Sequence, residues 1–297
     1  MKKKQVLAVL LVAFGLQLTA QKNLVLSNKW TPLFDKNLSY WENYVGVPHS
    51  SVVLEGYPKS DNVMKGGTPL GLNDVKKVMT IIDQNSEEVL YITGEIYAGL
   101  TTLAEFSNYH FKVQFKWGEK VWEPRLKDKR DSGILYHARG KHGAFWNVWM
   151  ESLELQVQET DMGDFVALNK VNGLIPTKKE GKIYKYVPGG DSIIVFGANA
   201  NGTRSEGYCH IPASAENAHG EWNTIELICL NNNSIHVVNG KVVMVVRNTK
   251  QIVEGKEVIL NSGKIQIQSE AAECYYKNAQ IKSIKKIPAN YKKAAGL

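Results

Sequence analysis

The chain has 297 residues, of which 43% are apolar, 22% charged and 9% aromatic, and this composition excludes a disordered protein. Its 36 Lys and Arg against 29 Asp and Glu give a formal net charge of +7. No long basic run interleaved with aromatic residues occurs. Since a nucleic-acid groove must neutralise several phosphates at once, we expect no nucleic-acid partner.

The first twenty residues have the pattern of an export signal. Lys2 to Lys4 form a basic region, Val6 to Leu18 form an apolar segment, and the expected cleavage falls before Gln21. The apolar segment is too short to cross a hydrocarbon core of about 30 Å, and no later segment is long enough. We therefore expect residues 1–20 to be a signal peptide and the mature chain to be periplasmic or secreted, with no membrane span.

Period-two alternation of apolar and polar residues predicts strands along most of the mature chain. The clearest strand is His110 to Trp117, in which every second residue is apolar. Residues 71–85 are expected to form a loop and then a strand, and Leu100 to Phe106 a short helix. Asn239-Gly240 predicts a hairpin, because both central positions of a type I′ turn need positive φ. Further short strands are expected at 89–92, 134–136, 153–157, 193–196, 224–229, 235–238, 242–246, 265–268 and 279–284.

Many short strands separated by Gly and Asn turns indicate an all-β sandwich of two sheets. No linker divides residues 21–297, so we expect a single domain there. Cys209, Cys229 and Cys274 are odd in number and widely spaced, which predicts buried free thiols and no disulfide framework.

Several motifs occur in a fixed order along the mature chain. They are Trp30 to Asp35 with Leu38 and Trp41, Asn108 to Phe111, Asp131 to Ile134, Glu154 to Gln158 leading to Asp161, Gly220 to Asn223, Val238 to Lys241 and Gly263 to Gln268. Together they resemble the 3-keto-disaccharide hydrolase family, and the resemblance implies a concanavalin-like jelly-roll sandwich of two antiparallel sheets whose concave sheet faces carbohydrate. One departure occurs where many relatives continue the Ser-Gly-Ile strand into an Arg, because this chain has His137 there and Arg139 two residues later.

The substrate class that the resemblance implies determines the chemistry. A ketone at C3 of a glycoside acidifies the C2 proton, so a base can form an enolate that expels the C1 substituent, and water can then add. The reaction needs a base, a cation or donor for the enolate oxygen, and an acid at the leaving oxygen. No cofactor is indicated by the sequence, and a sugar 3-oxidoreductase is the expected functional partner that supplies the substrate.

The strand Leu153 to Gln158 alternates between core and polar positions. Glu154, Gln156 and Gln158 are expected to line the concave sheet, since side chains at i, i+2 and i+4 share one face. Ordinary hydrolases of this fold carry several acids in such a row and use paired carboxylates. With a single carboxylate in the row, we expect Glu154 to be catalytic and the two glutamines to bind substrate; solvated polar positions are the alternative.

Two further groups are expected near the sugar. If Asp131 to Arg139 lies on the concave side, His137 is the expected proton shuttle and Arg139 the fixed cation for the enolate, although a lone His is more often structural. Trp146 and Trp149 are expected to bind substrate, because aromatic rings stack on sugar C–H faces, and core filling is the alternative.

Asp161 is a further expected substrate contact. Together with Asp164 it belongs to the acidic cluster of residues 158–164, which is dense enough for a hard divalent cation; a capped polar turn is the alternative interpretation.

Motifs of zinc peptidases, serine hydrolases and nucleotide-binding proteins are absent from the sequence. The favoured function is an exported enzyme that cleaves 3-keto-glycosides, and the alternative is a non-catalytic, lectin-like glycan-binding sandwich.

The leader predicts that protein recovered from its native host begins near Gln21. Intact-mass spectrometry of the exported fraction should show loss of the first twenty residues. A mature protein that still carries Met1 to Ala20 would contradict this expectation.

Overall fold

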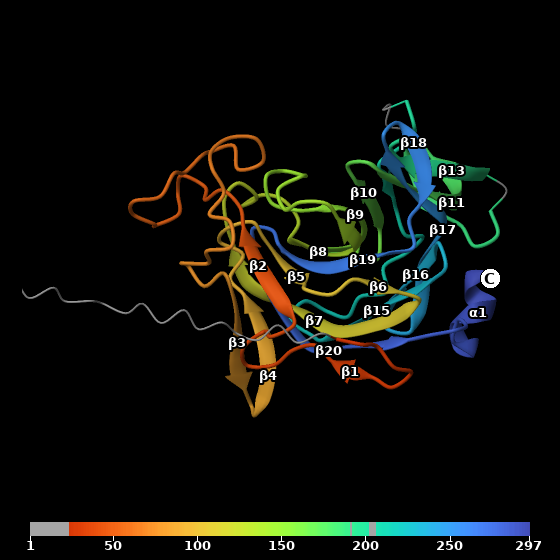
Figure 1. Cartoon of the computed structure of the whole chain (residues 1–297), viewed down its shortest axis with the longest axis horizontal. Helices are drawn as coiled ribbons and strands as arrows, with labels where there is room; N and C mark the ends of the chain where they lie inside the picture. The colour runs from red at the N-terminus through yellow and green to blue at the C-terminus, as the bar shows by residue number, and fades with distance from the viewer. Residues whose placement is uncertain (1–23, 191, 202–205) are drawn as a thin grey trace, which may run out of the picture.

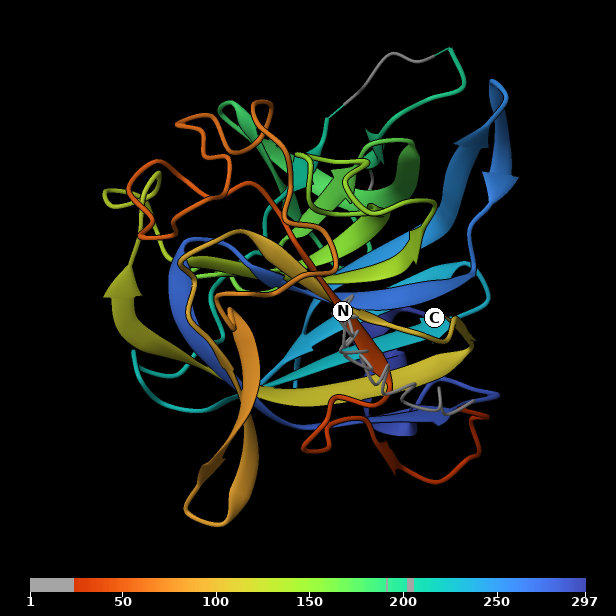
Figure 2. The same cartoon turned by 60° about the vertical axis from the view of Figure 1, so that its left-hand side comes forward.

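The computed structural model describes residues 24–190, 192–201 and 206–297, so the expected signal peptide lies outside the described residues. Two antiparallel sheets pack face to face, and Figures 1 and 2 show them as two layers. The strands of the described residues form a 12-stranded and an 8-stranded sheet, and the one helix among them lies at the C-terminus. The fold is therefore an all-β jelly-roll sandwich, as predicted.

The 12-stranded sheet has the order β12-β11-β17-β16-β15-β7-β20-β4-β3, and β1, β13 and β18 pair with β20, β11 and β17. Its strands are β1 (Thr31–Pro32), β3 (Met79–Gln84), β4 (Glu87–Ile92), β7 (Tyr109–Val121), β11 (Val171–Glu180), β12 (Ile183–Tyr186), β13 (Ser192–Gly197), β15 (Asn223–Leu230), β16 (Asn233–Val238), β17 (Lys241–Val253), β18 (Lys256–Ile259) and β20 (Ala272–Ser283).

The 8-stranded sheet has the order β14-β10-β9-β8-β19-β5-β2, and β6 pairs with β19. One of its faces packs on the 12-stranded sheet, and the opposite face is called the outer face below; it corresponds to the face expected to be concave. Its strands are β2 (Trp41–Val45), β5 (Ala98–Thr102), β6 (Phe106–Ser107), β8 (Asp131–Arg139), β9 (Glu151–Gln158), β10 (Phe165–Leu168), β14 (Tyr208–Cys209) and β19 (Ser262–Ser269).

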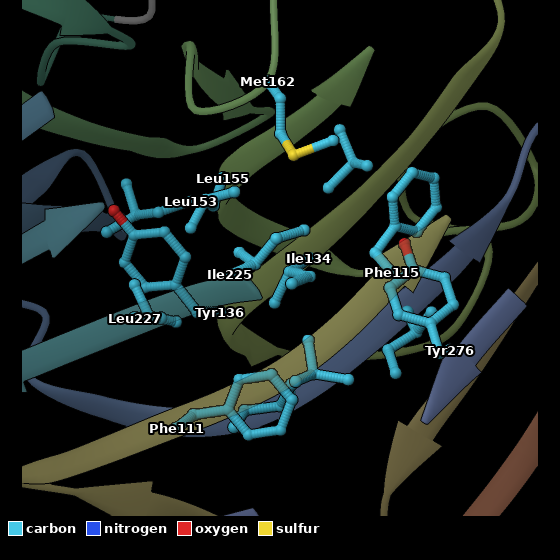
Figure 3. Packing of buried hydrophobic residues seen from close by; sticks show 14 of the residues in the cluster. Phe111, Phe115, Ile134, Tyr136, Leu153, Leu155, Met162, Ile225, Leu227 and Tyr276 are labelled. Atoms are coloured by element: carbon cyan, nitrogen blue, oxygen red, sulfur yellow. The ribbon is translucent and has the colours of Figure 1, made fainter. Parts of the chain in front are cut away.

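The core fills the space between the sheets with the residues that the alternation assigned to it. Phe111 and Phe115 of β7 and Leu155 of β9 are completely buried. In Figure 3 the side chains of β7 and Tyr276 point toward Ile134 and Leu155 from the opposite sheet. The three cysteines are free and buried, as predicted.

Local signals explain several elements and one error. Asn239 and Gly240 adopt φ values of 48° and 77° and close the β16–β17 hairpin, as predicted. Residues 71–85 form a loop and then β3, which also agrees with the prediction. The prediction of a helix at Leu100 to Phe106 is wrong, because the first half of this segment belongs to β5. Strand β5 is paired with β2 on one side and β19 on the other, and this pairing overrides the helical spacing of the apolar residues.

The C-terminal helix α1 (Ala289–Ala295) was not among the elements expected from the sequence. Tyr291 anchors it, because this side chain is buried and its hydroxyl donates to Glu226 Oε1 at 2.5 Å. Glu226 in turn contacts His110 Nε2 at 2.7 Å on the neighbouring strand. Among the residues that the structure describes, no helix combines the length and apolarity that crossing a membrane requires.

The burial of Phe115 predicts that Phe115→Ala lowers the free energy of unfolding by about 3–5 kcal/mol, because the ring packs on Trp117 and Tyr276 and its removal leaves a cavity. Urea unfolding followed by circular dichroism measures this loss. Leu72→Ala, at a side chain that is 65% exposed, is the control and should cost less than about 0.5 kcal/mol. Equal losses for both variants would contradict this view of the core.

Candidate functional site

A cavity of about 310 Å³ lies on the outer face of the 8-stranded sheet. Side chains of β8, β9 and β19 form its floor, and β10, β14 and two loops form its walls. We call it the acidic cavity. It is lined by Arg125, Asp131, Phe145, Trp146, Trp149, Glu154, Gln156, Gln158, Val166, Leu168, Tyr208, Gln268 and Glu270.

Strand β9 contributes three polar side chains to this cavity. Leu153, Leu155 and Val157 face the core, so Glu154, Gln156 and Gln158 face outward, as the alternation predicts. Glu154 is nevertheless only 4% exposed, because the surrounding walls cover it. The cavity thus holds a carboxyl group and two amides in a largely dehydrated setting.

Gly133 of β8 makes room for the functional groups above it. A Cβ atom at this position would collide with Glu154 Oε1 and Gln268 Oε1, which lie over the glycine from the strands on either side. Gln268 Oε1 is buried without a hydrogen-bond partner in the described part of the chain. The absence of a side chain at 133 therefore brings a carboxyl oxygen and an open amide acceptor together on the cavity floor.

A second group of charges lies at the end of the cavity where β8 begins. Arg125 Nη2 lies 2.6 Å from Asp131 Oδ2, and Arg125 Nη1 lies 2.7 Å from Glu270 Oε1. Gln158 Nε2 also donates to Asp131 Oδ2 at 2.7 Å. The guanidinium group thus bridges two buried carboxylates, while Asp131 Oδ1 has no hydrogen-bond partner among the described residues.

Burial shifts the proton affinity of these acids in one direction. Burial raises the pKa of Asp131 to about 7, although the positive charge of Arg125 and the hydrogen bond from Gln158 both lower it. Burial, followed by the negative charges of Glu270 and Asp131, also holds the pKa of Glu154 well above its usual range. Burial likewise holds the pKa of Glu270 well above its usual range, so the cavity has three carboxyl groups that can hold a proton where an exposed carboxyl cannot.

The loop before β9 supplies the aromatic wall. Trp146 and Asn147 both adopt left-handed φ values of 51° and 57°, and Trp149 N donates to Phe145 O at 2.9 Å. The Phe145 and Trp146 rings stack at 4.9 Å between centroids. Trp149 is only 1% exposed and donates from Nε1 to Ala98 O, so it supports the wall from below while the half-buried Trp146 faces the cavity.

The structure corrects the expected positions of His137 and Arg139. Pairing is irregular between Tyr136 and Arg139, and His137 adopts a left-handed φ of 49° at this bulge. The bulge turns the imidazole away from the cavity and toward the rings of Tyr109 and Tyr136, where it is 1% exposed. Burial lowers the pKa of His137 to about 3. Neither His137 nor Arg139 lines the acidic cavity, so neither is placed to transfer protons or stabilise an enolate there.

Asp161 and Asp164 do not act together as the acidic-cluster interpretation required. Asp161 lies outside the acidic cavity and pairs with Lys129, whereas Asp164 is completely buried and accepts from His210 Nδ1 at 2.9 Å. Within residues 24–190, 192–201 and 206–297, no group of three or more His, Cys, Asp or Glu is arranged to hold a metal ion.

Sequence reasoning missed Arg125, Glu270 and Tyr208 as cavity residues. Arg125 lies in the loop before β8 and Glu270 in the turn after β19, where no periodicity assigns a face. Asp131 and Gln268 could have been predicted as cavity residues from the sequence. Both occur in the quoted motifs, and both lie at strand positions whose side chains alternate toward the outer face. A row of polar residues on neighbouring strands was the signal that could have found them.

The acidic cavity on the outer sheet face of this jelly-roll sandwich combines carboxyl, amide and aromatic groups, which are the kinds of side chain that contact sugars. The chain belongs to the family of 3-keto-alpha-glucoside-1,2-lyase-like domains, whose model matches residues 29–282, and this confirms the resemblance found in the sequence. No curated protein matches the chain.

Solved structures with similar folds share little sequence with this chain. A proposed glycosyl hydrolase from Parabacteroides distasonis is 16% identical, with a TM-score of 0.46 over 86% of this chain and 100% of that chain. The β-glucanase of Bacillus licheniformis is 9% identical, with a TM-score of 0.42 over 87% and 99%. The carbohydrate-binding module CBM66 of Bacillus subtilis is 9% identical, with a TM-score of 0.38 over 69% and 92%.

The raised pKa of Asp131 predicts a specific pH dependence of stability. The folded protein keeps this proton up to about pH 7, whereas the unfolded chain loses it near pH 3.9, so ionisation between these values disfavours the folded state. The free energy of unfolding of the wild type, relative to Asp131→Asn, should therefore fall as pH rises through this window, by at most about 1.4 kcal/mol per pH unit. Urea unfolding of both proteins from pH 4 to 8 measures the difference, and a difference independent of pH would contradict the assignment.

Proposed function

We propose that this protein cleaves 3-keto-glycosides by removing the C2 proton and eliminating the C1 substituent. The observation that carries the proposal is the juxtaposition, in one cavity, of Asp131 and Glu154, whose pKa values are both raised, and the guanidinium group of Arg125. The family assignment supports the substrate class, since its description names a 3-keto-glucoside and a 1,2-lyase reaction.

The reaction balances without an oxidant or a reductant. A base takes the C2 proton, and the electrons of the C2–H bond form an enolate whose charge lies on the C3 oxygen. When the C3 carbonyl re-forms, a C1–C2 double bond appears, the C1–O bond breaks and the leaving oxygen takes a proton. Addition of water across the new double bond, with the hydroxyl group at C1 and the proton at C2, then gives the free 3-keto sugar.

The order of groups along the cavity suggests a role for each. Asp131, with a pKa near neutrality, is the base at C2. Arg125 lies against it and stabilises the enolate charge on the adjacent C3 oxygen. Glu154 leans over Gly133 from the next strand and, because it holds its proton, acts as the acid at the leaving oxygen on C1.

The remaining lining groups suit the binding of a sugar ring. Gln156, Gln158 and Gln268 offer amides to its hydroxyl groups, and Trp146 offers a ring face to its C–H face. The cavity holds three carboxyl groups, Asp131, Glu154 and Glu270, but Arg125 bridges two of them. The family's description as a 1,2-lyase therefore favours elimination over ordinary glycoside hydrolysis.

We extend the proposal to the setting of the reaction. The substrate must come from an enzyme that oxidises the C3 hydroxyl group of a glycoside, so functional coupling to a sugar 3-oxidoreductase is part of the proposed function. The leader of residues 1–20 supports export, which places the reaction in the periplasm or the medium.

Removal of either proton-transfer group should reduce turnover. We expect Glu154→Gln and Asp131→Asn each to lower kcat for a 3-keto-disaccharide by about 10²–10⁴-fold, as is usual for a positioned acid or base. Glu42→Gln is the matched control, since this carboxylate also lies on the 8-stranded sheet but pairs with Lys264 outside the acidic cavity. Loss of activity in the control, or full activity in both cavity variants, would contradict these roles.

The choice of substrate tests the mechanism independently of the variants. An unoxidised disaccharide has no acidified C2 proton and should be inert, whereas a 3-keto-disaccharide cleaved in D₂O should give a product sugar that carries deuterium at C2, as seen by NMR. Cleavage of ordinary disaccharides without deuterium at C2 would reject elimination. Binding of glycans with no cleavage of any 3-keto-glycoside would replace the enzyme by the lectin-like alternative.

A further inference from the structure

A second cavity, of about 370 Å³, lies beside the acidic cavity and has no role in the function described so far. We call it the side cavity. It is bounded by the loop before β9, by the turn between β10 and β11, by the end of β13 and by β17. Its lining residues are Ala144, Phe145, Trp146, Asn169, Lys170, Ala198, Asn199 and Ile252.

The two cavities share a wall. Phe145 and Trp146 line both of them, so the stacked ring pair stands between the two spaces. The next wall is also continuous, because Leu168 lines the acidic cavity and the adjacent Asn169 lines the side cavity. The two cavities are therefore neighbours, with the Phe145 and Trp146 rings as their common boundary.

Hydrogen bonds fix this arrangement in advance. Asn169 Nδ2 donates to Glu151 Oε1 at 3.0 Å and to Ala144 O at 3.4 Å, which ties the β10–β11 turn to the aromatic loop. Ile252 N donates to Lys170 O at 2.8 Å, which ties the same turn to β17. The side cavity is thus built from segments that are bonded to one another and to the wall of the acidic cavity.

The chemistry of the two cavities differs. The acidic cavity carries three carboxyl groups and three glutamines, which suit a polyhydroxylated ring. The side cavity has no carboxyl group among its lining residues; it has two aromatic rings, two alanines and an isoleucine, with two asparagines and a lysine as its polar groups. Such a lining suits a flat, largely apolar group with few hydroxyls.

We propose that the side cavity binds the leaving group of the substrate and that it selects aromatic or otherwise apolar aglycones. This inference rests on the proposed function, because it takes the sugar to lie in the acidic cavity. Glu154, the proposed acid at the C1 oxygen, is paired with Val166 of β10, the strand whose far end leads into Asn169 and Lys170. The C1 substituent consequently departs on the side of the acidic cavity that adjoins the side cavity.

A bulky side chain at position 252 tests the proposal. Ile252→Trp places an indole in the side cavity, and the ratio of kcat/KM for phenyl 3-keto-glucoside to that for methyl 3-keto-glucoside should fall by about 10-fold, within the range expected for lost apolar contacts. Val253→Trp is the matched control, because this neighbour is 38% exposed and does not line the side cavity, and it should keep the wild-type ratio. Equal ratios in the wild type and Ile252→Trp would overturn the proposal.

Direct binding separates this proposal from the proposed function and does not depend on a folded Ile252→Trp variant. By isothermal titration calorimetry, the wild type should bind unoxidised phenyl glucoside about 10-fold more tightly than methyl glucoside. If no 3-keto-glycoside is cleaved but this difference is found, the proposed reaction fails and the apolar subsite stands. If both glucosides bind equally, or if Ile252→Ala leaves the preference unchanged, the side cavity does not receive the aglycone.

Discussion

The guanidinium group of Arg125 is the interaction on which the site depends. Three carboxyl groups with raised pKa values face one small cavity, and an unpaired buried charge is strongly unfavourable. Arg125 contacts two of them, Asp131 and Glu270, and its positive charge opposes the effect of burial on their pKa values. Asp131 has a pKa of about 7, whereas burial holds the pKa values of Glu154 and Glu270 well above their usual range, so the acids of this cavity hold their protons unequally, as acid–base chemistry in a single cavity requires.

The backbone of β8 supports the same division. Gly133 leaves space for the groups that lie above it, and Asp131 begins the strand where the loop that carries Arg125 ends. Ser132, Ile134 and Tyr136 bury the opposite face in the core. Leu135 is an apolar residue on the otherwise polar outer face, and it is buried there in a cluster with Trp149 and Leu168. The strand therefore fixes the cavity floor and the core at once.

The sequence predicted those parts of the site that obey a period of two, and it failed where this period breaks. Glu154, Gln156 and Gln158 lie on an uninterrupted strand, so their shared face followed from alternation alone. Period-two alternation also places His137 on the outer face, but the bulge after Tyr136 turns its side chain to the opposite face of the sheet. Arg125 and Glu270 belong to a loop and a turn, where only the tertiary fold decides what a side chain faces. The fold itself was predictable, because it depends on many alternating strands rather than on one residue.

The left-handed turn at Trp146 and Asn147 has a consequence for divergence within the family. The stacked rings that it presents form a boundary of both cavities, so a change in the length of this one loop would alter the size of the two cavities together. Asp131 and Glu154 lie on β8 and β9 of the sheet beneath, outside the loop. Under the proposed function, one insertion or deletion in this loop would therefore change the range of substrates without replacing the groups that carry the reaction.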